Sequence, residues 1–192
     1  MKSLYLLRHA KSSWSEPGLG DQQRPLNKRG LRDAPMMGGR FCNRGEALDR
    51  MLSSPAQRAQ STAELFGNAC GFSISSIITE PDLYFHGSGS IETLILEQPD
   101  HLQSLMLVFH NPDITQFANS IDYDFHVDNI PSCGLVRLDS TIDRWCDWSR
   151  DTTHFNYFDF PKNDSAKLHT CSRRNRRGIS AERWLDRIEA RV

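Results

Sequence analysis

The chain begins with the run LYLLRHA at residues 4–10, in which four largely apolar residues lead directly into Arg8 and His9. Such an apolar run is typical of a buried strand. Ligands bind at the carboxyl ends of strands in open α/β sheets. This run therefore predicts both a fold class and the place of a functional site.

A second run repeats the arrangement. Residues 105–109 read LMLVF, and they are followed at once by His110, Asn111 and Pro112. Two buried strands that each deliver a histidine at the C-terminal end are hard to explain by packing alone. We therefore expect the two histidines to share one site.

Strand and helix patterns alternate along most of the chain. The expected strands are 3–8, 49–53, 74–79 and 104–109, and amphipathic helices fall between and after them. This alternation predicts an α/β fold with a mainly parallel sheet, right-handed crossovers and helices on both faces. Residues 133–139 read as a further strand, which we expect to pair with 143–149 as an antiparallel edge hairpin.

Helix starts are indicated by polar capping residues. We expect Asn27 to cap a helix that runs to about residue 44. Ser54 precedes Pro55 and is expected to cap the next helix. Ser90 is the expected cap of a third, and Ser180 of a helix close to the C-terminus.

Length and charge indicate one main domain with a basic end. The 192 residues suit a single core, and no repeat or linker interrupts them before about residue 160. We expect a domain over 1–160 and a basic extension over 161–192, which would contain the helix expected after Ser180. The run RRNRRG at 173–178 is typical of a solvated tail, although it leaves contact with phosphate, RNA or an acidic partner open. The net charge of −1 gives the whole protein no general attraction for nucleic acid, which disfavours nucleic acid as a partner.

The five cysteines are scattered and never in C-x-x-C spacing, which favours a reducing cytoplasm over a disulfide framework or a zinc site. No apolar run approaches the ~20 residues of a membrane span. Arg8 and His9 interrupt the first run before a secretory pattern forms. We expect a cytoplasmic protein with no membrane partner, cofactor or metal.

Five basic or imidazole side chains are expected at strand ends or in first helical turns: Arg8, His9, Arg24, Arg58 and His110. Arginine binds phosphate oxygens in bidentate geometry, and free helix N–H groups add to the attraction. The pattern predicts a pocket for a tetrahedral dianion. His9 would attack phosphorus, with its tautomer fixed by a backbone carbonyl. Arg8, Arg58 and a cationic His110 would stabilise the transferring oxygens.

Four segments in register resemble the histidine phosphatase superfamily, the phosphoglycerate-mutase-like group, and within it the SixA-type phosphohistidine phosphatases. They are LLRHAKSSW at 6–14, RPLNKRG at 24–30, LSSPAQRAQSTA at 52–63 and HNP at 110–112. The resemblance covers about residues 1–140. It implies a three-layer α/β/α sandwich, His9 as phospho-accepting nucleophile, a phosphate site of Arg8, Arg58 and His110, and Arg24 as a further pocket residue.

Two departures from the family pattern bear on the reaction. Phe109 stands where the family usually has glycine, so its ring could crowd the pocket. The LYFH segment at 83–86 lacks the glutamic acid that many members carry, and Glu80 and Asp82 are out of register. An alkoxide needs a proton donor to leave. A histidine imidazole needs less help, so the missing acid favours phosphohistidine over alkyl phosphates.

The sequence thus predicts a metal-independent phosphatase acting on a phosphorylated protein or small molecule. Ser15, Arg24 and His86 are candidate substrate-binding residues in the loops that would set specificity. Three alternatives remain at this point. They are a catalytically weak phospho-ligand-binding module, a mutase (disfavoured because no clear proton donor or lid is present), and an RNA-binding protein acting through 173–177.

Overall fold

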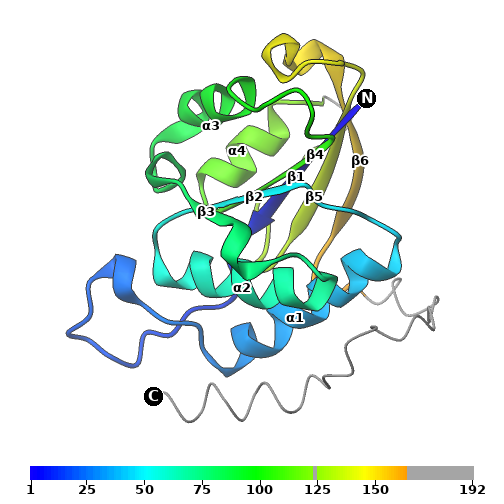
Figure 1. The fold of residues 1–192 in the computed structure, drawn as a ribbon. Coiled ribbons are helices and arrows are strands. Elements are labelled where there is room, and N and C mark those ends of the chain that lie inside the picture. The colour runs from blue at the N-terminus through cyan, green and yellow to red at the C-terminus, as the bar shows by residue number, and fades with distance from the viewer. Residues whose placement is uncertain (123–124, 164–192) are drawn as a thin grey trace.

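The computed structural model describes residues 1–122 and 125–163, which form one six-stranded sheet flanked by helices (Figure 1). The strand order is β3-β2-β4-β1-β5-β6. The strands are β1 (Lys2–Arg8), β2 (Arg50–Ser53), β3 (Ile77–Thr79), β4 (Ser104–Phe109), β5 (Leu135–Ser140) and β6 (Thr153–Asp159). Strands β1 to β4 are parallel to one another. At one edge, β5 runs antiparallel to β1, and β6 runs antiparallel to β5.

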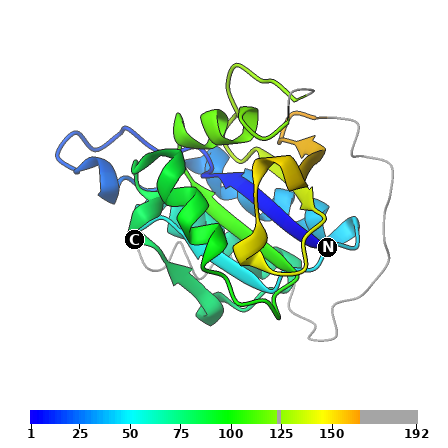
Figure 2. The same cartoon turned by 90° about the horizontal axis from the view of Figure 1, so that it is seen from above.

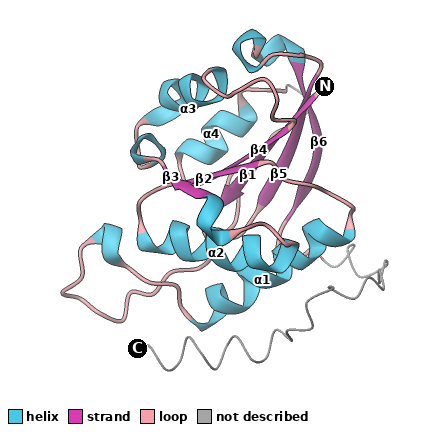
Figure 3. Ribbon diagram, in the orientation of Figure 1, coloured by secondary structure: helices cyan, strands magenta, loops and turns pink. Residues whose placement is uncertain are grey.

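Helices cover both faces of the sheet (Figures 1 and 3). They are α1 (Lys28–Asn43), α2 (Gln57–Cys70), α3 (Gly87–Leu96) and α4 (Asp113–Asn119). The crossovers through α1 and α2 lead from β1 out to β2 and β3, whereas α3 leads back to β4. Because parallel crossovers are right-handed, this reversal of direction places α1 and α2 on one face and α3 and α4 on the other. The predicted three-layer α/β fold is confirmed.

The core consists of two apolar layers separated by the sheet. Successive side chains of β1 point to opposite faces. Leu4 and Leu6 pack in the layer under α3 and α4, whereas Tyr5 and Leu7 pack in the layer under α1 and α2. β1 is therefore buried on both sides and lies beside β4 in the middle of the sheet (Figure 2).

One predicted helix cap is confirmed and two are wrong. The Asn27 side chain accepts a hydrogen bond from the Gly30 N–H (3.0 Å) at the start of α1. Helix α2 begins at Gln57 and has Ala56 at its N-cap, and the Ser54 hydroxyl lies beside His110 instead. Helix α3 begins three residues before Ser90, at Gly87.

The antiparallel edge is present, but its second strand was assigned to the wrong residues. Residues 145–147 form a 3-10 turn that buries Trp145, and the strand that pairs with β5 is β6. The Trp145 indole N–H donates to the Leu102 carbonyl (2.9 Å), and the Trp145 backbone N–H donates to Asp100 (3.0 Å). These bonds hold the turn against the loop before β4, where it cannot pair with β5.

The basic run at 173–178 and the helix expected after Ser180 lie outside the described residues. In the part of the chain that is described, no helix is long and apolar enough to cross a membrane.

Candidate active site

The two histidines meet because β1 and β4 are neighbours in register. Arg8 pairs with Phe109, so the residues that follow, His9 and His110, leave the sheet side by side. The His9 N–H donates to the Phe109 carbonyl (3.1 Å), and the two imidazole centres are 5.0 Å apart. The predicted convergence of the two strand ends is present in the structure.

These histidines line a pocket of about 260 Å³ at the carboxyl end of the parallel strands. The other lining residues are Arg8, Lys11, Ser12, Trp14, Asp21, Arg24, Arg58, Phe85, Asn111 and Ser132. Four of the lining side chains are cationic and one is a carboxylate. The pocket therefore favours a compact anion. Within residues 1–122 and 125–163, no group of three or more His, Cys, Asp or Glu side chains is placed to hold a metal ion.

The backbone fixes the tautomer of His9. Its Nδ1 lies 2.8 Å from the Ala10 carbonyl oxygen, which can only accept, so Nδ1 carries the proton. Nε2 is then left with a free lone pair. Burial, together with the positive charges of Arg58 and Arg8, outweighs the opposing hydrogen bond to Ala10 and lowers the pKa of His9 to about 3. His9 is therefore neutral and nucleophilic across the physiological pH range.

Thr62 supports this arrangement from α2. Its hydroxyl donates to the Arg58 carbonyl (2.6 Å) and accepts from the Ala10 N–H (2.9 Å). Ala10, whose carbonyl holds the His9 ring, is thus tied through its N–H to the helix that carries Arg58.

His110 is oriented by Ser54. The Ser54 Oγ lies 2.7 Å from His110 Nε2 and also accepts a longer bond from the Ala56 N–H (3.4 Å). Among the described residues, Nε2 is the one acceptor bonded to the Ser54 hydroxyl, so we infer that Oγ donates to Nε2 and that the His110 proton lies on Nδ1. Nδ1 is buried and has no hydrogen-bond partner among the described side chains and backbone, so its N–H can bind a ligand oxygen.

His110 is neutral in this structure. Burial lowers its pKa to about 2, and the neighbouring His9 and Arg58 act in the same direction, whereas Asp21 opposes them. The sequence predicts a cationic His110 when a phosphate dianion is bound beside it. A neutral Nδ1–H still donates a hydrogen bond to a phosphate oxygen.

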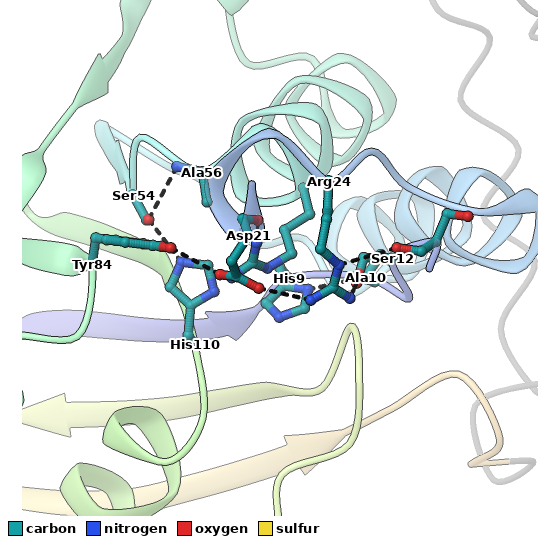
Figure 4. Close-up of polar contacts among 11 residues, drawn as sticks. His9, Ala10, Ser12, Asp21, Arg24, Ser54, Ala56, Tyr84 and His110 are labelled. Atoms are coloured by element: carbon teal, nitrogen blue, oxygen red, sulfur yellow. Dashed lines mark hydrogen bonds and ion pairs between the residues drawn. The ribbon is translucent and has the colours of Figure 1, made fainter. Parts of the chain in front are cut away.

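Arg58 is held by Asp21, a residue that the sequence analysis missed. Arg58 Nη2 donates to the Asp21 carboxylate (2.8 Å), and Nη1 donates to the Asp21 carbonyl (2.5 Å). Tyr84 donates its hydroxyl proton to the same carboxylate (2.8 Å) (Figure 4). Burial raises the pKa of Asp21, but the bonds from Tyr84, Arg58 and Arg24 outweigh it and lower the pKa to about 2. Asp21 is therefore a fixed anion that cannot act as a general acid at neutral pH.

Arg24 lines the pocket, and its guanidinium donates hydrogen bonds to the surrounding loop. Nε donates to the Ser13 carbonyl (3.1 Å), Nη1 to Asp21 (2.8 Å) and Nη2 to the Ser12 hydroxyl (2.6 Å). The Trp14 ring covers its guanidinium, with Cζ 3.2 Å from the ring centre. Arg24 thus shapes the wall of the pocket and adds positive charge to it.

Arg8 is anchored on the other side, by the loop before β5. Its Nη1 donates to the Ile130 carbonyl (2.5 Å) and to the Asn129 side chain (3.2 Å). Burial lowers its pKa from the usual arginine value. Nε is buried and lacks a partner within the described part of the chain, so it is available to an anion in the pocket.

Three residues singled out in the sequence lie apart from this cluster. Ser15 is exposed and bonds to the Ser13 hydroxyl (2.7 Å). His86 pairs with Asp82 (3.2 Å) and does not line the pocket. The Phe109 ring is buried in the apolar layer under α3 and α4, so it does not fill the pocket.

Sequence reasoning missed Asp21, Ser54, Tyr84 and Phe85 at the site. The sequence does hold a signal for Asp21, which precedes Arg24 by one helical turn in DQQR. Ser54 was interpreted as a helix cap, because a serine before proline commonly is one. Tyr84 and Phe85 lie in the loop after β3, and their sequence carries no signal for the contacts with Asp21 and His110 that the fold brings about.

Comparison with known proteins agrees with this geometry. Residues 4–114, more than half of the chain, match the model of the histidine phosphatase superfamily (branch 1). An uncharacterised chloroplast protein of Arabidopsis thaliana is 32% identical over 115 residues, which are 59% of this chain and 50% of that protein. An uncharacterised protein of Mycobacterium tuberculosis is 32% identical over 112 residues, 58% of this chain and 67% of that one. The chain therefore spans only about half to two thirds of these relatives.

Solved structures share the fold over most of the chain. A protein of Agrobacterium tumefaciens assigned as a phosphohistidine phosphatase SixA is 28% identical, with a TM-score of 0.69 over 83% of this chain and 98% of that one. A protein histidine phosphatase SixA complexed with tungstate gives a TM-score of 0.67 over 83% and 97%, and at 19% identity it shows the shared fold alone. With the family model, the strand-end histidines and the arginine-lined pocket in agreement, the chain belongs to the histidine phosphatase superfamily.

Proposed function

We propose that this protein is a phosphatase that hydrolyses a phosphomonoester or phosphoramidate through a covalent phosphohistidine on His9. One observation carries the proposal. The Ala10 carbonyl holds the Nδ1 proton of His9, which leaves Nε2 as a free nucleophile in a pocket with Arg8, Arg58 and His110.

The reaction takes two displacements. Nε2 of His9 attacks phosphorus, the bond from phosphorus to the leaving atom breaks, and that atom keeps the electron pair and takes up a proton. Water then attacks the phosphohistidine, the P–Nε2 bond breaks, and a proton from the water is lost to solvent. The products are inorganic phosphate, the protonated leaving group and neutral His9. Arg8, Arg58 and the His110 Nδ1–H are placed to bind the oxygens that gain charge.

A phosphoramidate substrate, above all phosphohistidine on a protein, suits the side chains of the pocket. The one carboxylate that lines it, Asp21, has its pKa lowered to about 2 and stays ionised, so it donates no proton to an alkoxide. A departing imidazole is readily protonated and needs no such donor. The similarity to the Agrobacterium protein assigned as SixA supports the same substrate.

Burst-phase labelling tests the covalent intermediate. Wild-type protein mixed with a radiolabelled phosphohistidine peptide in EDTA should form an acid-labile, alkali-stable phosphoenzyme in amounts up to one per chain. His9→Ala should form none, while His101→Ala, which changes an exposed histidine, should label like the wild type. Labelling of His9→Ala would exclude the mechanism.

A substrate panel separates turnover from binding. We expect faster hydrolysis of a phosphohistidine protein than of a phosphotyrosine peptide or of small sugar phosphates. Phosphate binding without hydrolysis of any of them would instead indicate a phospho-ligand-binding module of the same fold. Residues 1–160 are the proposed catalytic domain, and truncation after residue 163 should leave these activities intact.

A further inference from the structure

Two of the exposed aromatic side chains lie at the pocket. The large hydrophobic side chains exposed in the described residues are Met1, Trp14, Ile74, Ile78, Phe85 and Leu96. Of these, Trp14 (74% exposed) and Phe85 (46% exposed) line the anion pocket, and both are aromatic. Aromatic side chains are common in the lining of pockets that bind small molecules.

The backbone holds Phe85 in place at some cost. Its φ is +60°, a conformation that bulky residues rarely adopt. Its ring stacks on His110, with 5.0 Å between ring centres and 29° between planes, and it meets the Tyr84 ring edge-on. Tyr84 is itself bonded to Asp21. Such strain in the backbone tends to persist at functional sites, where the surrounding contacts enforce it.

Trp14 lies at the other end of the pocket from Phe85, beside Arg24. Figure 4 shows Tyr84 and His110 at one end, Arg24 and Ser12 at the other, and His9 with Asp21 between them. The Trp14 ring lies over Arg24, and most of its surface faces solvent. Phe85 therefore contacts His110 at one end of the pocket, and Trp14 contacts Arg24 at the other.

We propose that Phe85, with Trp14 as a second wall, forms a subsite for a planar aromatic leaving group. This inference rests on the proposed function and names the substrate class: a phosphoryl group bonded to an aromatic ring, such as an imidazole or a phenol. In an in-line displacement, the leaving atom lies on the far side of phosphorus from His9 Nε2. The leaving group therefore extends away from His9, and Phe85 and Trp14 are the exposed aromatic side chains of the pocket lining that it can contact.

Stacking of the substrate ring on Phe85 would continue the stack that begins with His110. An aromatic pair adds a preference of about threefold to tenfold over a non-aromatic group of similar area. Phe85 could instead serve only to orient His110. These two roles differ in their consequences, because loss of a positioning contact slows every substrate alike.

Activated substrates with and without a ring distinguish the two roles. The measured quantity is the ratio of kcat/KM for p-nitrophenyl phosphate to that for acetyl phosphate, and likewise for phosphohistidine against phospholysine. Phe85→Leu should lower both ratios by about threefold to tenfold, and Trp14→Leu should lower them less. Phe85→Tyr should restore them. Leu96→Ala, an exposed residue of α3 outside the pocket, should leave them unchanged.

A binding measurement makes the inference independent of turnover. Wild-type protein should bind phenylphosphonate more tightly than methylphosphonate, and Phe85→Leu should lose that preference. Equal loss on all substrates, or no preference for phenylphosphonate, would overturn the aromatic subsite while leaving the phosphatase proposal standing. Absence of phosphoenzyme together with a retained phenyl preference would overturn the proposed function instead.

Discussion

Lowering the pH from 7 to 5 should destabilise this protein through the two histidines of the site. Burial holds the folded-state pKa of His9 at about 3 and that of His110 at about 2. In the unfolded chain both return to about 6.5. The unfolded state therefore binds protons below pH 6.5 that the folded state does not. The stabilisation is complete above that pH and is lost progressively as the pH falls toward the folded values.

The size of the effect follows from the gap between these values. Between pH 7 and pH 5, each histidine that stays neutral in the folded state lowers the free energy of unfolding by about 2 kcal/mol. The two together contribute about 4 kcal/mol, a large fraction of the 5–15 kcal/mol typical of a domain.

Urea unfolding at pH 7 and pH 5 measures this loss. The His110→Gln variant has one buried imidazole fewer, so its loss between the two pH values should be smaller than the wild-type loss by about 2 kcal/mol. His101→Gln, a change at an exposed position, should keep the wild-type loss. Equal losses in His110→Gln and the wild type would refute the reasoning, since His110 would then take up its proton in the folded protein.

Substitutions at Ser54 and Asp21 test the site, and substitutions at two glycines of α1 test the packing of that helix. Ser54→Ala removes the hydroxyl that fixes the His110 tautomer and should lower kcat by about tenfold, whereas Ser54→Thr should retain most activity. Asp21→Asn loosens Arg58 and should lower kcat by about tenfold. KM should not rise, because the substitution removes a carboxylate that competes with phosphate for Arg58. A raised KM at unchanged kcat would contradict this role. A Cβ at Gly38 would lie 2.3 Å from the Phe66 carbonyl oxygen of α2, so thermal unfolding should show Gly38→Ala destabilised by about 1–3 kcal/mol. Gly39→Ala meets nothing within 4 Å and should instead stabilise α1 by about 0.5–1 kcal/mol.

The sheet and its histidines could be predicted because they depend on local patterns. Apolar runs long enough to be buried strands occur at β1 and β4, and each stops at a histidine. Parallel strands present their carboxyl ends at one edge of a sheet, so the predicted strand ends already placed His9 and His110 on the same edge.

The sequence predicts the second edge strand at the wrong residues because tryptophans do not distinguish a strand from a 3-10 turn. Trp145 and Trp148 read as hairpin residues, yet the structure packs both into the layer under α3 and α4. An indole fills a core equally well from a 3-10 turn and from a strand. The bonds from Trp145 to Leu102 and Asp100 decide between them, and these partners lie 43 and 45 residues away in the chain.

By itself, the sequence determined the layered α/β class, the strand ends that carry His9 and His110, and the positive charge around them. Only the tertiary structure decided which tautomers the imidazoles adopt and what holds the arginines. Ser54 reaches His110 across 56 residues, Asp21 reaches Arg58 across 37, and Tyr84 reaches Asp21 across 63. A hydroxyl or carboxylate has many possible local partners, and the choice among them depends on which groups the folded sheet and helices bring within hydrogen-bond distance.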